Sequence, residues 1–230
     1  MRRIVSLLVA AGLAVSLIAL AGPAGAQTSS LSAFCAARLE GNDAQGKAAN
    51  LAVMNKAVAA APADILPAMT ALRAAYEKKG EKLFNSPAGL ALITALDSQV
   101  YDKCPGTKVP VTAIDYEFQG MPATLPAGPT NFKFTNNAPK EDHMLVIQKL
   151  NAKGETMNLD DILALPEKKA NQYLEQTGGA FMYAPAGQTF YSPANLTPGK
   201  YFYACFVPQG GKKNGKPHFM LGMKGTFTVQ

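Results

Sequence analysis

The chain has 230 residues, which is enough for one large domain or two small ones. Apolar types make up 48% of the residues and charged types 17%, so most of the chain is expected to fold. The net charge is +6, but no long block of Lys and Arg is present, so nucleic acid is not expected as a partner. There are three Cys and only two His. If two of the Cys form a disulfide, one thiol is left over.

Residues 1–26 are typical of a secretory signal peptide. Arg2 and Arg3 precede an almost wholly apolar run, and Ala24–Ala26 offers the small residues of a cleavage site. The alternative is an uncleaved anchor, because the apolar run is close to the length that spans a bilayer. Gly22-Pro23 and the small residues favour cleavage after Ala26. The mature protein is then expected to be secreted or periplasmic and free of the membrane, in an oxidising space where disulfides persist.

Residues 27–104 predict a helical domain of three or four helices. Lys78-Lys79-Gly80 indicates the end of a helix, with cations in the last turn and Gly beyond it. Asn85-Ser86-Pro87 indicates the start of the next, with a capping side chain before a first-turn Pro. The apolar residues at helical spacing are Leu51, Met54, Val58, Ile65, Met69, Leu72 and Tyr76.

Residues 105–230 have the pattern of a β-sandwich, with short alternating segments separated by Pro and Gly. One helical insert is expected among the strands, over Leu159–Gln176. The fold class predicted for the whole chain is α+β with two domains, a helical bundle followed by a sandwich. The strand candidates are Val109–Ala113, Tyr116–Phe118, Phe132–Thr135, Met144–Lys149, Lys200–Phe206 and Gly225–Val229.

Two of the three cysteines enclose the helical part. Cys35 opens it and Cys104 closes it, so a disulfide between them would join the ends of the bundle. Spacing alone does not fix the connectivity, and the alternative is that either of them pairs with Cys205. If Cys35 pairs with Cys104, Cys205 is left as a thiol in a compartment where thiols are usually oxidised, and this calls for a reason.

Four residues near predicted strand ends supply that reason. Cys205 ends an aromatic strand, His218 and Met223 follow it, and His143 lies just before another strand. Two imidazoles, a thiolate and a weak thioether are the ligand set of a type 1 copper site, because soft sulfur favours Cu(I) while imidazole suits both oxidation states. Taken singly, each His and the Cys is more often a packed or surface side chain, but both His of the chain fall where this pattern needs them.

The segment Thr107–Gln230 resembles the cupredoxins, the plastocyanin and azurin group of small blue copper proteins. "LPAGPTNFKFTNNAPKEDHMLVI" is similar to the family's strand, Asn-rich turn and first His ligand, and "GKYFYACFVP…PHFMLGMKGTFTV" to its closing hairpin. The resemblance implies a cupredoxin-like Greek-key sandwich that binds copper. It also implies His143 and His218 as imidazole ligands, Cys205 as the thiolate and Met223 as the axial thioether, with Met220 as the alternative axial residue. The helical part is similar to Cys-bounded helical regions joined to such domains in secreted bacterial proteins.

The chain departs from the family between the Cys and the second His. Family members place two to four residues there, whereas Phe206 to Pro217 is twelve residues long in this chain. The extra residues are mostly Gly and Lys, and we call residues 209–216 the Gly/Lys loop. We expect this loop to fold outward, because a long loop costs little more to close than a medium one.

The function predicted from these residues is a mononuclear copper protein that carries single electrons, not an enzyme. The alternative is copper storage or delivery, or a cupredoxin-like module that binds a partner without metal. The expected partner is a redox protein or a copper donor or acceptor. Lys212, Lys213, Lys216 and Lys224 are either a solvated cluster or a docking patch for an acidic partner.

Overall fold

The computed structural model describes residues 30–84 and 86–230, so the predicted leader lies outside the described residues. The N-terminal helices are α1 (Leu31–Glu40), α2 (Gly46–Ala60), α3 (Leu66–Lys79), the short 3-10 helix η1 (Gly80–Leu83) and α4 (Pro87–Lys103). The strands are β1 (Thr107–Ile114), β2 (Glu117–Gln119), β3 (Thr124–Leu125), β4 (Gly128–Asn136), β5 (His143–Lys149), β6 (Ala180–Ala184), β7 (Thr189–Leu196), β8 (Gly199–Ala204) and β9 (Lys224–Val229). Short helices lie between strands: α5 (Ala152–Glu155), α6 (Leu159–Leu163), α7 (Glu167–Ala170), η2 (Asn171–Tyr173), η3 (Gln209–Gly211) and η4 (His218–Leu221).

The predicted helix signals coincide with observed helix ends. Ser86 caps α4, where its hydroxyl accepts a hydrogen bond from the Gly89 N–H at 3.2 Å, and Pro87 is the first helical residue. α3 ends at Lys79, and Gly80 follows with a φ of 57°, a left-handed conformation that suits Gly. Within the described residues, no helix is both long enough and apolar enough to cross a bilayer.

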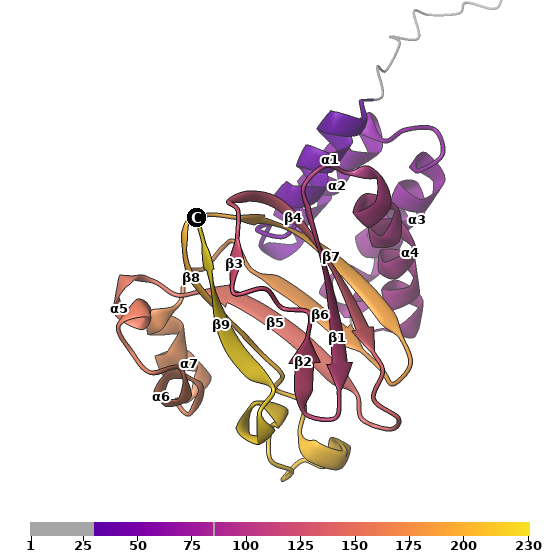
Figure 1. Cartoon of the computed structure of the whole chain (residues 1–230). Helices are drawn as coiled ribbons and strands as arrows, with labels where there is room; N and C mark the ends of the chain where they lie inside the picture. Colours follow the sequence, from indigo (N-terminus) through magenta and orange to yellow (C-terminus); the bar gives the residue numbers. More distant parts are fainter. Residues whose placement is uncertain (1–29, 85) are drawn as a thin grey trace, which may run out of the picture.

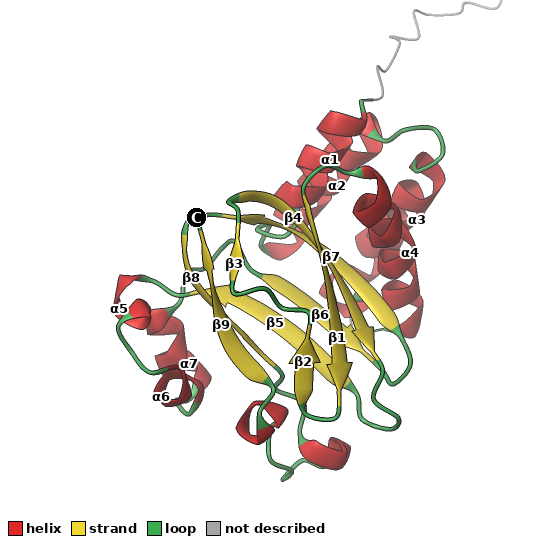
Figure 2. Ribbon diagram, viewed as in Figure 1, coloured by secondary structure: helices red, strands yellow, loops and turns green. Residues whose placement is uncertain are grey.

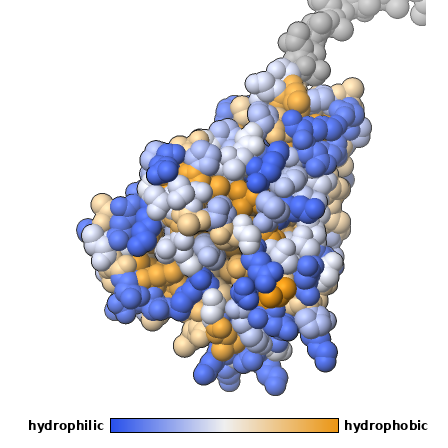
Figure 3. Space-filling view, viewed as in Figure 1, coloured by the Kyte–Doolittle hydropathy of each residue, from blue (hydrophilic) through white to orange (hydrophobic). Residues whose placement is uncertain are grey.

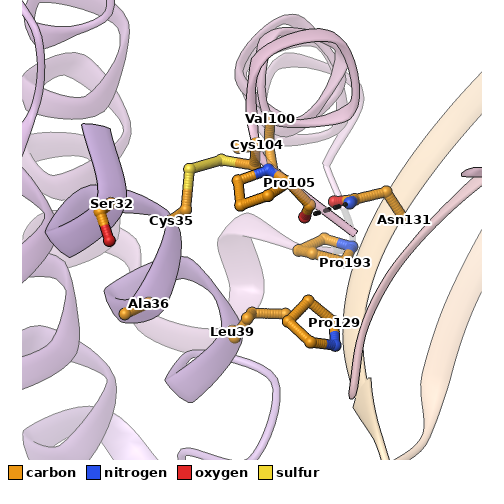
Figure 4. Close-up of a pocket in the computed structure, with 10 residues that line it drawn as sticks. All are labelled: Ser32, Cys35, Ala36, Leu39, Val100, Cys104, Pro105, Pro129, Asn131 and Pro193. Atoms are coloured by element: carbon orange, nitrogen blue, oxygen red, sulfur yellow. Dashed lines mark hydrogen bonds between the residues drawn. A yellow bond between two sulfur atoms is a disulfide. The ribbon is translucent and has the colours of Figure 1, made fainter. Parts of the chain in front are cut away.

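The helical part has a core of its own, closed by a disulfide. The predicted apolar residues Ile65, Met69, Leu72 and Tyr76 are buried in it. Cys35 and Cys104 form the predicted disulfide, with a Cα–Cα distance of 5.6 Å, and join α1 to the end of α4 (Figure 4). The prediction is therefore confirmed, and Cys205 is a free, buried thiol.

The strands form two sheets that pack face to face (Figures 1 and 2). One sheet has the order β2-β1-β4-β7 and the other β3-β9-β8-β5-β6. β1 alternates buried and exposed residues, so that its apolar side chains enter the core between the sheets. The α+β architecture predicted from the sequence is confirmed. The chain passes from helix to strand between Lys103 and Thr107, while a division into two separate domains stays a prediction.

β8 is buried on both faces. Tyr201 points into the core between the sheets, whereas Phe202 and Ala204 belong to a second apolar cluster that includes Ile162 and Leu163 of α6. The helices α5–α7 cover the outer face of the sheet beside β8 and β9 (Figure 1). This double burial explains why β8 is aromatic along its length and does not alternate with polar residues.

The helical insert begins earlier and is more broken than the sequence predicted. Within the predicted segment Leu159–Gln176 the chain forms α6, α7 and η2, and α5 precedes them. Asn158 starts α6 by accepting a hydrogen bond from the Asp160 N–H at 2.8 Å, and Pro166 precedes α7. A cap and a Pro at this spacing divide the segment into single turns.

The strands β6 and β7 are absent from the sequence prediction. β7 contains Pro193, which lies opposite Asn131 of β4. A Pro tolerates this place because β7 is an edge strand of its sheet, and α4 of the helical part packs against it. The helices therefore cover the β4–β7 end of the first sheet (Figure 2).

Candidate metal centre

Three candidate ligands meet at one end of the sandwich. His143 opens β5, Cys205 directly follows β8, and His218 opens η4. All three side chains have 0% exposure. One ligand atom from each lies within 4.8 Å of the other two, which makes them a candidate metal site among the described residues.

The distances between the donor atoms suit one small ion. Sγ of Cys205 lies 3.5 Å from Nδ1 of His218 and 3.8 Å from Nδ1 of His143, and the two Nδ1 atoms are 3.0 Å apart. An ion about 2.0 Å from each imidazole nitrogen and about 2.3 Å from sulfur, the bond lengths found on zinc, separates such donors by roughly 3–4 Å. The donor types, two imidazoles and a thiolate, are those of copper electron-transfer sites.

Strand register brings the three residues together. β5 and β8 are antiparallel, with Val146 opposite Ala204, so that the start of β5 lies beside the end of β8. The connection before β5 is held by Asn136, which is fully buried. Its side-chain amide donates to the carbonyls of Glu141 at 2.8 Å and Ala184 at 2.9 Å. The Asn-rich turn thus fixes the backbone that presents His143.

The Gly/Lys loop is closed at its base, so it does not separate the two closing ligands. Pro208 and Pro217 form an isolated antiparallel bridge, and the Gln209 N–H donates to the Lys216 carbonyl at 3.0 Å. Closer to the site, the His218 N–H donates to the Val207 carbonyl at 2.9 Å. The loop therefore folds outward, as expected.

The two candidate axial residues differ in burial. Met223 has 0% exposure, and its carbonyl accepts a hydrogen bond from the Cys205 N–H at 3.0 Å. Met220 is 59% exposed. Burial next to the thiol favours Met223 over Met220 as the thioether of this centre.

Burial governs the protonation of the centre. Burial and, to a smaller extent, the nearby His218 together lower the pKa of His143 to about 4. Burial also lowers the pKa of His218 and raises that of the Cys205 thiol, although the Met144 N–H, 3.3 Å from Sγ, favours the thiolate. Neutral imidazoles have a free lone pair for a metal, and a cation would offset the cost of a buried thiolate.

Both imidazoles keep an Nε2 that is buried and has no hydrogen-bond partner within the described residues. A buried polar atom without a partner is uncommon and calls for an explanation. Because Nδ1 of each ring faces the other two donors, binding of an ion through Nδ1 would leave the proton on Nε2. The rings thus fit a metal in the orientation that the structure gives them.

Sequence reasoning missed the residues that cover His218. The ring of Tyr116 packs edge-on against the imidazole, with centroids 4.9 Å apart. The Oε2 of Glu141 lies 3.7 Å from Nε2 of His218. Gln209 and Gly210 of the Gly/Lys loop donate to Tyr116 and Glu141, respectively. The only sequence signal for this group was that Glu141 lies two residues before His143.

No family model matches the chain, and no curated protein does. Solved structures with similarity to it include auracyanin B, at 23% identity over 55% of this chain and 90% of that chain, with a TM-score of 0.38. Auracyanin A, a "blue" copper protein from Chloroflexus aurantiacus, matches at 20% identity over 53% of this chain and 99% of its own, with a TM-score of 0.32. An azurin from Methylomonas sp. strain J matches at 15% identity over 55% and 99%, with a TM-score of 0.34.

The C-terminal part of the chain is cupredoxin-like. Two stacked sheets carry a buried His-Cys-His cluster at one end, and this donor set suits copper.

Proposed function

We propose that this protein binds one copper ion and carries single electrons between partner proteins. The observation that carries the proposal is the convergence of His143, Cys205 and His218 on one buried point. Cys205 is left free for this role because Cys35 and Cys104 pair with each other. We propose Met223 as the axial ligand on the strength of its burial.

The arrangement supports electron transfer because the ligands are held by the sandwich. His143 and Cys205 belong to paired strands, and the backbone of His218 is bonded to that of Val207. When bound, copper supplies the one-electron couple, and the protein supplies a donor set that suits both oxidation states. A donor set that moves little when the ion changes charge favours rapid transfer.

The same burial argues against copper delivery and against catalysis at this centre. A delivery protein has to pass its ion to a partner's ligands, and a catalytic metal keeps an open position for substrate. Here the three donors and Met223 all have 0% exposure. An electron, in contrast with an ion or a substrate, does not need contact with the metal to leave the site.

We propose that the partner is an acidic redox protein and that it docks at the end of the sandwich that holds the centre. Lys212, Lys213 and Lys216 are exposed on the Gly/Lys loop, whereas Lys224 forms an ion pair with Asp160. Hydrophilic residues gather at the lower end of the molecule, where η3 and η4 lie (Figures 1 and 3). Exposed cations there would speed association with an acidic surface at low salt. Export from the cytoplasm, proposed from the leader, agrees with the disulfide.

Titration of the metal-free protein with Cu(II), followed by optical and EPR spectra, tests the proposal. We expect one equivalent of copper and a strong visible charge-transfer band from the thiolate. Cys205→Ser should abolish the band and leave the fold, since the two side chains are similar in size. Met220→Leu is the control, because Met220 is exposed, and should leave the band unchanged. A band that survives Cys205→Ser would refute the assignment.

A further inference from the structure

The outer edge of the His218 ring faces a carboxylate. Nε2 of His218 is fully buried, and Oε2 of Glu141 lies 3.7 Å from it. The Glu141 side chain is 20% exposed, so its charge is only partly screened by water. If His218 binds a metal through Nδ1, the ring proton sits on Nε2 and points toward this carboxylate.

Glu141 also holds the Gly/Lys loop. Both of its carboxylate oxygens accept from the Gly210 N–H at 3.0 Å, and its Oε1 accepts from the Tyr116 hydroxyl at 3.4 Å. Tyr116 in turn accepts from the side-chain amide of Gln209 at 3.1 Å and lies against the His218 ring. The Glu141 carboxylate thus contacts Gly210 of the Gly/Lys loop and Tyr116, which packs on the His218 ring, and it lies 3.7 Å from Nε2 of that ring.

Tyr116 adopts an unusual conformation to take this place. Its φ is 59°, the one positive φ of a non-Gly residue in the described chain. An aromatic residue is strained in this region by about 1–3 kcal/mol, and such strain persists only where surrounding contacts determine it. Tyr116 is the second residue of the two-residue turn between β1 and β2, and its contacts to His218, Glu141 and Gln209 help to hold it there.

We propose that Glu141 is a positioning residue for copper: its carboxylate attracts the Nε2 proton of His218 and fastens the start of the Gly/Lys loop beside the site. The inference rests on the proposed function and goes beyond it, because it assigns a role to the long loop. A carboxylate that accepts from the far nitrogen of a ligating His fixes its tautomer and orientation and makes the ring a stronger donor. A stronger donor stabilises Cu(II) more than Cu(I), so Glu141 lowers the reduction potential.

The test compares Glu141→Gln with Asp115→Asn and Glu141→Asp. Asp115→Asn removes the same charge from an exposed residue whose field reaches His143 but which has no contact with His218. Glu141→Gln should weaken Cu(II) binding about tenfold, the lower end of the usual effect of such partners. With Cu(I) binding unchanged, a tenfold loss raises the potential by about 59 mV. Asp115→Asn should produce a smaller rise, and Glu141→Asp should restore part of the wild-type value.

A second measurement does not depend on copper redox chemistry. In the protein loaded with Zn(II), which is diamagnetic, the Nε2 proton of His218 should exchange slowly with water. Exchange should be faster in Glu141→Gln, since a charge-assisted hydrogen bond is about twice as strong as a neutral one. A potential that shifts equally in Glu141→Gln and Asp115→Asn, or an unchanged exchange rate, overturns the inference and leaves the copper assignment standing. A wild-type protein that binds neither ion through Cys205 overturns both.

Discussion

The candidate ligands are unusual residues even before a metal is considered. Two imidazoles lie fully buried with their Nδ1 atoms 3.0 Å apart, so a positive charge on either ring is costly and charges on both rings are more so. A bound cation would replace that contact with two metal–nitrogen bonds to neutral rings. The site is therefore expected to lower the stability of the metal-free protein and to raise that of the metal-loaded protein.

This tension predicts how the stability of the metal-free protein depends on pH. The pKa of His143 is about 4 in the folded chain and near 6.5 when unfolded, so the unfolded state binds more protons between these values. The free energy of unfolding is then highest above about pH 6.5. It falls toward pH 4, by up to about 1.4 kcal/mol per pH unit for each such histidine. Urea unfolding across this range measures the effect, and a constant midpoint would contradict the burial of His143.

At the residue scale, the sequence indicated the candidate ligands but not their surroundings. His143, Cys205, His218 and Met223 stood out because few residues of these types exist in the chain and all lie near strand ends. Glu141 was not among the predicted site residues, because its place beside His218 depends on contacts between distant parts of the chain. These include the hydrogen bond from Gly210, 69 positions away. A long-range contact of this kind leaves no periodicity or motif in the sequence.

At the scale of elements, the Gly/Lys loop has a simple experimental consequence. The pairing of Gln209 with Lys216 already closes an antiparallel ladder. Residues 210–215 can therefore be replaced by Asn-Gly, the pair that best forms a two-residue hairpin turn. We expect the thiolate–copper band to persist, because the hydrogen bond between His218 and Val207 holds the two ligand segments together outside the replaced residues. Optical titration checks it, and loss of the band in a folded variant would show that the loop itself is needed to form the centre.

The two longest strands that sequence analysis missed share a physical cause. β7 contains Pro193, and β6 ends just before Pro185, so both strands lie among the residues that normally separate strands. Pro193 is accepted because β7 lies at an edge that α4 covers, which is a tertiary property. The helix ends at Lys79 and Pro87 were predicted well, since caps and stops are local.

At the scale of the whole molecule, the helical part and the sandwich have separate cores. The seam between them is incompletely filled. A cleft of about 560 Å³ is lined from both sides, by Arg38 and Asp97 of the helices and Phe181 and Tyr191 of the strands. A smaller pocket of about 180 Å³ lies at the same seam beside the disulfide (Figure 4). Unfilled space between the two cores predicts weak coupling between the two parts.

The disulfide provides the test of this weak coupling. It closes a loop with a sequence separation of 69 and lies wholly within the helical part. The chain-entropy estimate for a loop of this length is about 4 kcal/mol. In the double variant Cys35→Ser with Cys104→Ser, we expect the helical circular dichroism to be lost at a much lower denaturant concentration.

The copper band of the same variant should persist to nearly the wild-type concentration, because the sandwich and Cys205 are unchanged. Both signals are read from one sample, so protein concentration and copper loading are matched. Wild-type protein unfolded under the same conditions is the control, and it gives the difference between the midpoints of the two signals when the disulfide is present. If both signals shift together in the variant, the bundle and the sandwich unfold as one cooperative unit, and the seam is stronger than its packing indicates.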